Sequence, residues 1–155
     1  YTESDLLLTE AIRTGIFEHL SASELLSVLS SMIFQARTQE TLAPRIPTGN
    51  VQSALVEVTR LWARLEAIEK EHQVATQREP DFGFCWIAFR WANGHSLQSV
   101  LKGSDLSVGD FVRSTKQLID LLGQVASASE DLRPKCREGM KRLDRGVVAY
   151  LAGDL

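Results

Sequence analysis

Residues 109–126 read GDFVRSTKQLIDLLGQVA, and this stretch decides the fold class. Its apolar side chains recur at three- and four-residue steps, which is the spacing of one face of an α-helix. Ser107 is the natural N-cap, because Asp110 follows three residues later. The stretch therefore predicts a long helix with one buried face. The opposite, polar face carries Arg113, Lys116, Gln117, Asp120 and Gln124.

The rest of the chain shows the same helical period and no convincing two-residue alternation. Pro44, Pro47 and Gly49 interrupt the pattern, and so does the segment 78–83. We expect further helices over residues 4–15, from a capping box at 21–24 as far as 36, and over 51–72, 84–93, 96–103 and 131–152. The sequence therefore predicts an all-α fold, a single bundle of about six or seven helices, as one domain over residues 1–155.

Length and composition narrow the class of protein. The chain has 155 residues, is 44% hydrophobic and carries a formal net charge of −3. It is long enough to bury a real core and too apolar for disorder. Its apolar runs fall short of the ~18 residues that a membrane span needs. The acidic balance argues against a freestanding nucleic-acid binder. Because the chain opens at Tyr1 without a leader, we expect a piece of a larger, cytoplasmic protein.

A search for catalytic and metal-binding patterns is negative. The chain has no GxxxxGK[ST] phosphate loop and no GxGxxG, HExxH or GxSxG motif. Cys85 and Cys136 lie far apart and neither belongs to a CxxC pair, so we expect two reduced thiols rather than a zinc site. We therefore expect no catalytic residue, no metal and no cofactor within this piece, which is not an enzyme by itself.

A second candidate site lies late in the chain. Between positions 133 and 145, six basic residues stand beside two acidic ones. Clustered basic groups on a helix can track a phosphate backbone, but a solvated amphipathic helix next to acidic neighbours is favoured over contact with a strand. This secondary basic patch consists of Arg137, Lys141, Arg142 and Arg145.

Aromatic residues are concentrated between positions 82 and 91. Exposed aromatic rings hold single strands by stacking on bases. In a short apolar helix, however, Trp and Phe more often belong to the core. We therefore expect most of them to be buried, Trp91 above all. The residues are Phe82, Phe84, Trp86, Phe89 and Trp91.

Several segments, in order, resemble one family. They read ESDLL at 3–7, GIFEHLS at 15–21, SSMIF at 30–34, REPDFGF at 78–84, RWANGHSL at 90–97 and SDLSVGDFVR at 104–113. Together they resemble the DSHCT domain, the C-terminal helical domain of superkiller/exosome-type superfamily-two RNA helicases, and most of all its bacterial HelY-like branch. The resemblance spans nearly the whole chain.

The resemblance implies a helical bundle packed behind two RecA-like motor domains, which bind and hydrolyse ATP with Mg and lie outside this sequence. It also implies a ratchet helix that faces one nucleic-acid strand, and residues 109–126 correspond to it. Arg113 and Lys116 match the basic positions of the family pattern and Asp120 matches the acidic one. Gln117 is a departure, because the eukaryotic pattern favours arginine there.

Two functions stay open. The first is the nucleic-acid-guiding domain of an ATP-dependent DEAD/DEAH-box-type RNA helicase, which lines the channel for single-stranded RNA or, alternatively, DNA. The second is a helical docking module that recruits an RNA-degradation or RNA-processing partner without touching RNA, as the acidic first third of the chain suggests. Intrahelical pairs, Asp110 with Arg113 and Lys116 with Asp120, would explain the polar face without any strand.

Overall fold

The computed structural model describes residues 5–36, 44–73 and 78–152, and within these ranges every regular element is a helix. The predicted all-α class is therefore confirmed. None of the described helices is long and apolar enough to cross a membrane. The elements are α1 (Asp5–Arg13), α2 (Ala22–Ser30), α3 (Gly49–Glu71), the 3-10 helix η1 (Phe82–Phe84), α4 (Cys85–Ala92), α5 (Leu97–Leu101), α6 (Val108–Ala128), α7 (Arg133–Leu143) and α8 (Gly146–Ala152).

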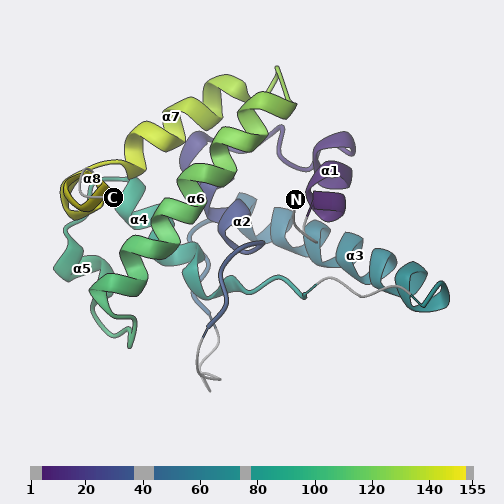
Figure 1. Cartoon of the computed structure of the whole chain (residues 1–155), viewed down its shortest axis with the longest axis horizontal. Coiled ribbons are helices and arrows are strands. Elements are labelled where there is room, and N and C mark those ends of the chain that lie inside the picture. The colour runs from purple at the N-terminus through teal and green to yellow at the C-terminus, as the bar shows by residue number, and fades with distance from the viewer. Residues whose placement is uncertain (1–4, 37–43, 74–77, 153–155) are drawn as a thin grey trace.

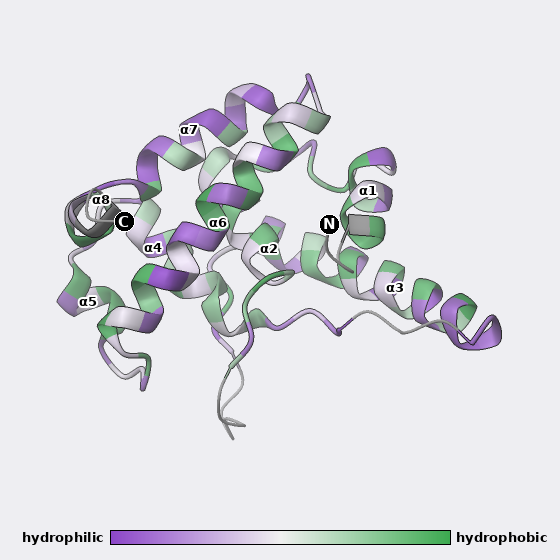
Figure 2. Ribbon diagram, viewed as in Figure 1, coloured by the Kyte–Doolittle hydropathy of each residue, from purple (hydrophilic) through white to green (hydrophobic). Residues whose placement is uncertain are grey.

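Helix α2 lies at the centre of the bundle, in contact with α3, α4, α6 and α7. Helices α6 and α7 run side by side along one side of it, whereas α3 crosses the other side with α1 packed against it (Figure 1). The ribbon of α6 alternates between hydrophilic and hydrophobic positions, as an amphipathic helix requires, while α7 is mostly hydrophilic (Figure 2). The long helix expected over 109–126 is thus present as α6.

The start of α2 shows how local sequence signals connect the bundle. The Ser21 hydroxyl accepts a hydrogen bond from the Glu24 amide (3.2 Å), and Glu24 accepts one from the Ser21 amide (3.0 Å). The Thr48 hydroxyl, which caps α3, donates to the same carboxylate (2.7 Å). Burial raises the pKa of Glu24, but these hydrogen bonds outweigh burial and the net pKa is lowered. The expected capping box is confirmed, and it joins two helix starts.

The prediction of one continuous helix over residues 131–152 is wrong, because the structure has two helices there. Helix α7 ends at Leu143 and α8 begins at Gly146. Gly146 has a φ of +55°, a left-handed backbone conformation that glycine adopts more easily than residues with a Cβ, and the chain turns there. Lys141 and Arg142 in the last turn, with a glycine beyond, form a helix-stop signal that the sequence already contained. Similarly, α2 ends at Ser30 rather than near position 36.

Aromatic rings fill the centre of the core. Phe84 stacks on Phe34 with centroids 5.1 Å apart, and Trp91 meets Phe111 edge-on at the same separation. Trp91 is buried and its indole N–H donates to the Leu143 carbonyl (2.9 Å), as a buried tryptophan requires. Burial is thus confirmed for Phe84 and Trp91. The expectation that most of the run is buried is wrong, because the three other aromatic residues are only half-buried: Phe82, Trp86 and Phe89.

Candidate nucleic-acid interface

The polar face of α6 presents a straight row of exposed side chains: Arg113, Gln117, Asp120 and Gln124. At ~100° of rotation per residue, these positions fall within an arc of about 60°. The Ser107 hydroxyl begins the helix by accepting from the Asp110 amide (3.1 Å). The opposite face is buried, so packing fixes the rotation of α6 and leaves this row toward solvent.

Arg113 already has a partner in its own helix. Its guanidinium donates to Asp110 Oδ1 (2.8 Å), three residues earlier. The Arg113 side chain nevertheless remains 61% exposed. An exposed ion pair of this kind stabilises a helix by only about 0.2–0.5 kcal/mol, so a phosphate could exchange for the carboxylate at small cost.

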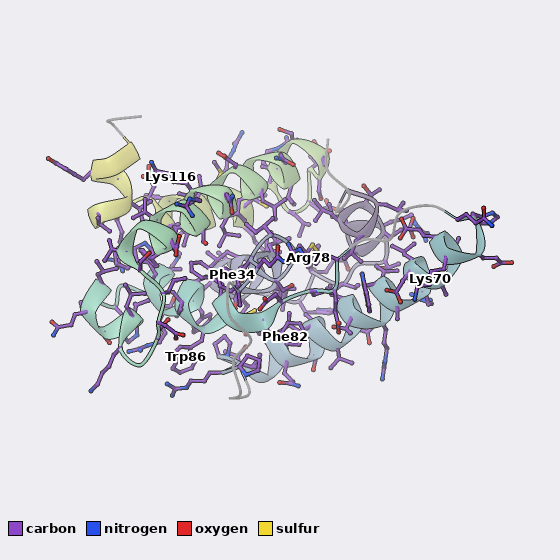
Figure 3. All side chains as sticks on the ribbon, turned by 60° about the horizontal axis from the view of Figure 1, so that its bottom comes forward. Phe34, Lys70, Arg78, Phe82, Trp86 and Lys116 are labelled. Atoms are coloured by element: carbon purple, nitrogen blue, oxygen red, sulfur yellow. The ribbon has the colours of Figure 1, made fainter. Side chains whose placement is uncertain are left out.

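Lys116 does not belong to the exposed row. It is half-buried, and its Nζ is shielded from solvent with no hydrogen-bond partner within the described ranges. The pair expected with Asp120 is not among the ion pairs found in those ranges. Figure 3 shows Lys116 toward α8, away from Phe34, Phe82 and Trp86. The structure thus separates Lys116 from the four other candidates of this face.

A groove of about 1690 Å³ runs beside the exposed row. Arg113, Ser114 and Gln117 of α6 line it, together with residues of α3, of η1 and α4, and of the segment that connects α5 to α6. Phe82 and Trp86 lie on the same side of the molecule in Figure 3, and both line the groove. The first half of the polar face therefore borders this groove.

The secondary basic patch contains three exposed residues and one half-buried residue. Arg137 and Lys141 are exposed, whereas Arg142 is exposed but bound to Glu138 in its own helix (2.8 Å). Arg145 is half-buried, and burial lowers the pKa of its guanidinium. Arg145 donates to the carbonyl of Trp91 (2.6 Å) and lies 3.6 Å from the centroid of the indole ring. Arg145 therefore joins the turn between α7 and α8 to the end of α4. Of the patch, Arg137 and Lys141 are the exposed members that a strand could contact without displacing an ion pair.

A structural role not found in the sequence belongs to the segment REPDFG. Arg78 donates to the carbonyls of Phe34 (2.6 Å) and Met32 (3.4 Å), which follow α2. Asp81 accepts from the Ala36 amide (2.9 Å) through its carboxylate. The segment thus clamps the chain beyond α2, and it lines the groove. The only signal in sequence was an arginine and an aspartate three residues apart, which indicates no partner.

The two cysteines are free and buried. Burial raises the pKa of each thiol to about 11, so both are neutral at physiological pH. Among the described residues, no group of three His, Cys, Asp or Glu side chains could hold a metal ion.

Comparison with known proteins decides the family. The model of the DSHCT (NUC185) domain matches residues 1–151. The chain belongs to the DSHCT family. The DSHCT domain is 38% identical over 99% of its length to the probable helicase HelY of Mycobacterium leprae, and 37% identical over 99% to that of Mycobacterium tuberculosis. It is 25% identical over 93% of its length to the human exosome RNA helicase MTR4.

The DSHCT domain spans only a small part of these relatives. It covers 18% of the HelY proteins and 14% of human MTR4. The resemblance read from the sequence, including its HelY-like branch, is confirmed. The chain thus corresponds to one domain of much larger helicases.

Proposed function

We propose that this DSHCT domain guides a single strand of RNA through an ATP-dependent DEAD/DEAH-box-type helicase, as its C-terminal domain. Motor domains of RecA type would bind ATP and Mg, while this domain would supply neither catalytic residues nor a cofactor of its own. The relatives include an exosome RNA helicase, which favours RNA over DNA and an RNA-degradation partner. We place the parent protein in the cytoplasm.

The observation that carries the proposal is the exposed row on α6 beside the groove. Gln117 and Arg113 lie one turn apart, and both line the groove. Glutamine can donate to and accept from a base edge, and arginine can neutralise a phosphate. Of the candidate ratchet residues, Asp120 and Gln124 extend the row, and Lys116 lies to its side with a shielded ammonium.

The test is a double variant, Arg113→Ala with Gln117→Ala, in the full-length helicase. A matched control, Arg64→Ala with Gln98→Ala, removes the same two residue types from exposed positions outside the groove. We expect strand unwinding to fall severalfold in the first variant and to be unchanged in the second, with equal melting temperatures. Normal unwinding by a folded double variant would contradict the proposal.

A second candidate function, docking of an RNA-processing protein, is favoured by exposed apolar side chains. Ile68 near the end of α3 is 52% exposed and Leu6 in α1 is 47% exposed. A docking module would place these side chains under a protein partner. Crosslinking separates the two functions: RNA crosslinks on α6 support the guiding role, whereas a protein partner with no RNA crosslink on α6 supports docking.

A further inference from the structure

An arginine and a tryptophan form a stacked pair in the groove, on elements other than α6. The guanidinium carbon of Arg45 lies over the Trp86 ring, 4.2 Å from its centroid. Arg45 is exposed and Trp86 is half-buried, and both line the groove. The guanidinium therefore lies over the indole ring and, because Arg45 is exposed, remains accessible from the groove.

Trp86 is firmly placed. It belongs to α4, where both of its chain neighbours, Cys85 and Ile87, are buried in the core. A second guanidinium, that of Arg90, lies 5.4 Å from the same ring centroid. Arg90 in turn donates to the carbonyl (3.2 Å) and the hydroxyl (2.8 Å) of Ser99. The indole is thus a fixed platform, and Arg45 is the more exposed member of the pair.

The charge of the groove suits an anionic chain better than the whole domain does. Five basic and four acidic side chains line it, whereas the chain as a whole carries −3. Engaged groups balance in this count, since Asp110 pairs with Arg113, Asp81 accepts from backbone amides and Arg78 donates to backbone carbonyls. The net positive lining distinguishes this groove from the overall acidic surface.

We propose that one nucleobase of the bound strand stacks on the Arg45 guanidinium, which Trp86 supports from behind. The inference rests on the proposed function and adds a contact from the α3–α4 side of the groove to the one from α6. Guanidinium planes and aromatic faces are the surfaces on which single-stranded bases stack, independently of sequence. The strand would be held between a stacking platform and the polar row that begins at Arg113.

A peptide segment is the competing occupant. An acidic peptide would use the positive charge of Arg45, and lysine would replace arginine in that role. Base stacking needs the guanidinium plane, which lysine lacks. The two occupants therefore differ in their response to Arg45→Lys.

The experiment measures binding of a fluorescent 15-nucleotide oligouridylate to the full-length helicase. Arg45→Ala and Arg45→Lys are compared with Arg64→Ala, an exposed arginine of α3 outside the groove. We expect both Arg45 variants to weaken binding by roughly fivefold or more, the loss of one stacked base, and the Arg64 control to bind as before. With an oligomer of abasic sites, wild type and Arg45→Lys should bind equally.

Three outcomes would overturn the inference. Arg45→Lys binding like wild type would show that charge alone acts there. Unchanged RNA binding in both Arg45 variants, with Arg113→Ala plus Gln117→Ala still defective in unwinding, would refute the platform and leave the guiding role intact. Unchanged RNA binding together with a lower melting temperature of the helicase would assign the Arg45–Trp86 pair a structural role only. If the α6 double variant also unwound normally, the guiding role itself would fail.

Discussion

Arg145 offers the sharpest test of structural against strand-binding roles, because the sequence placed it in the basic patch and the structure places it, half-buried, against the end of α4. Its guanidinium donates to the Trp91 carbonyl (2.6 Å) and to the His95 carbonyl (2.7 Å). It also lies 3.6 Å from the centroid of the Trp91 ring. Arg145→Ala removes all of these contacts at once, next to the turn that starts α8.

The expected loss follows from these contacts. A hydrogen bond from a charged donor contributes about 1.5–3 kcal/mol net, and a partly desolvated cation–π contact about 1–2 kcal/mol. The contacts share one guanidinium and are not additive, and the Trp91 carbonyl keeps a bond from the Gly94 amide (3.1 Å). We therefore expect Arg145→Ala to lower the free energy of unfolding by about 2–4 kcal/mol. For a domain of this size that corresponds to roughly 4–16 °C in melting temperature.

Thermal and urea unfolding, followed by circular dichroism, measure this loss. Lys141→Ala is the matched control, because Lys141 is an exposed member of the same patch. It should change stability by less than about 0.5 kcal/mol. Arg145→Ala with wild-type stability but weaker RNA binding would refute the structural role and restore Arg145 to the strand-binding patch.

The remaining predictions concern burial, titration and packing. Cys85 and Cys136 should resist alkylation by iodoacetamide at pH 8 in the native domain and react in urea; rapid native alkylation would contradict their burial. Because the pKa of Glu24 is lowered on folding, its contribution is complete above the unfolded pKa and disappears as pH falls through the folded pKa. Glu24→Gln should therefore destabilise the domain more at pH 7 than at pH 3, as urea titrations at both pH values can check. Gly139→Leu should cost about 1–3 kcal/mol, because even a Cβ at Gly139 would lie 3.3 Å from side chains of α2 and α6. Gly123→Ala should stabilise by about 0.5–1 kcal/mol in the same melting assay, because its Cβ would lie at an ordinary van der Waals distance, 3.7 Å, from Met140 Cε.

Sequence periodicity predicted those features that depend on residues close in the chain. The stripe on α6, its Ser107 cap and the capping box of α2 all involve partners within four residues, and the structure contains each of them. The burial of Trp91 was predicted in the same way, because a large aromatic ring in a short apolar helix usually packs into the core. Local spacing was sufficient in these cases because the relevant hydrogen bonds and faces are themselves local.

The features that sequence reasoning missed depend on contacts between distant residues. Arg78 binds a carbonyl 44 positions away, and Arg145 binds one 54 positions away. The sequence does not show whether an arginine contacts water, a phosphate or a buried carbonyl. Composition therefore could not distinguish the structural role of Arg145 from the exposed position of Lys141. The groove and the Arg45–Trp86 pair likewise exist only because α3, α4 and α6 are brought together by the fold.

The mixed charge of the α6 row bears on how a domain could guide a strand that must move. Between Arg113 and Gln124 the exposed row contains one cation and one anion, Asp120, with glutamines around them. Each phosphate neutralised by a fixed cation adds to the affinity and to its salt dependence, so a strongly basic row would hold the strand at one register. Amide side chains and stacking surfaces bind with little dependence on register or sequence. A weak, mostly uncharged contact therefore agrees both with the acidic composition of this chain and with a strand that advances, while the main electrostatic attraction would come from the motor domains that we propose beside it.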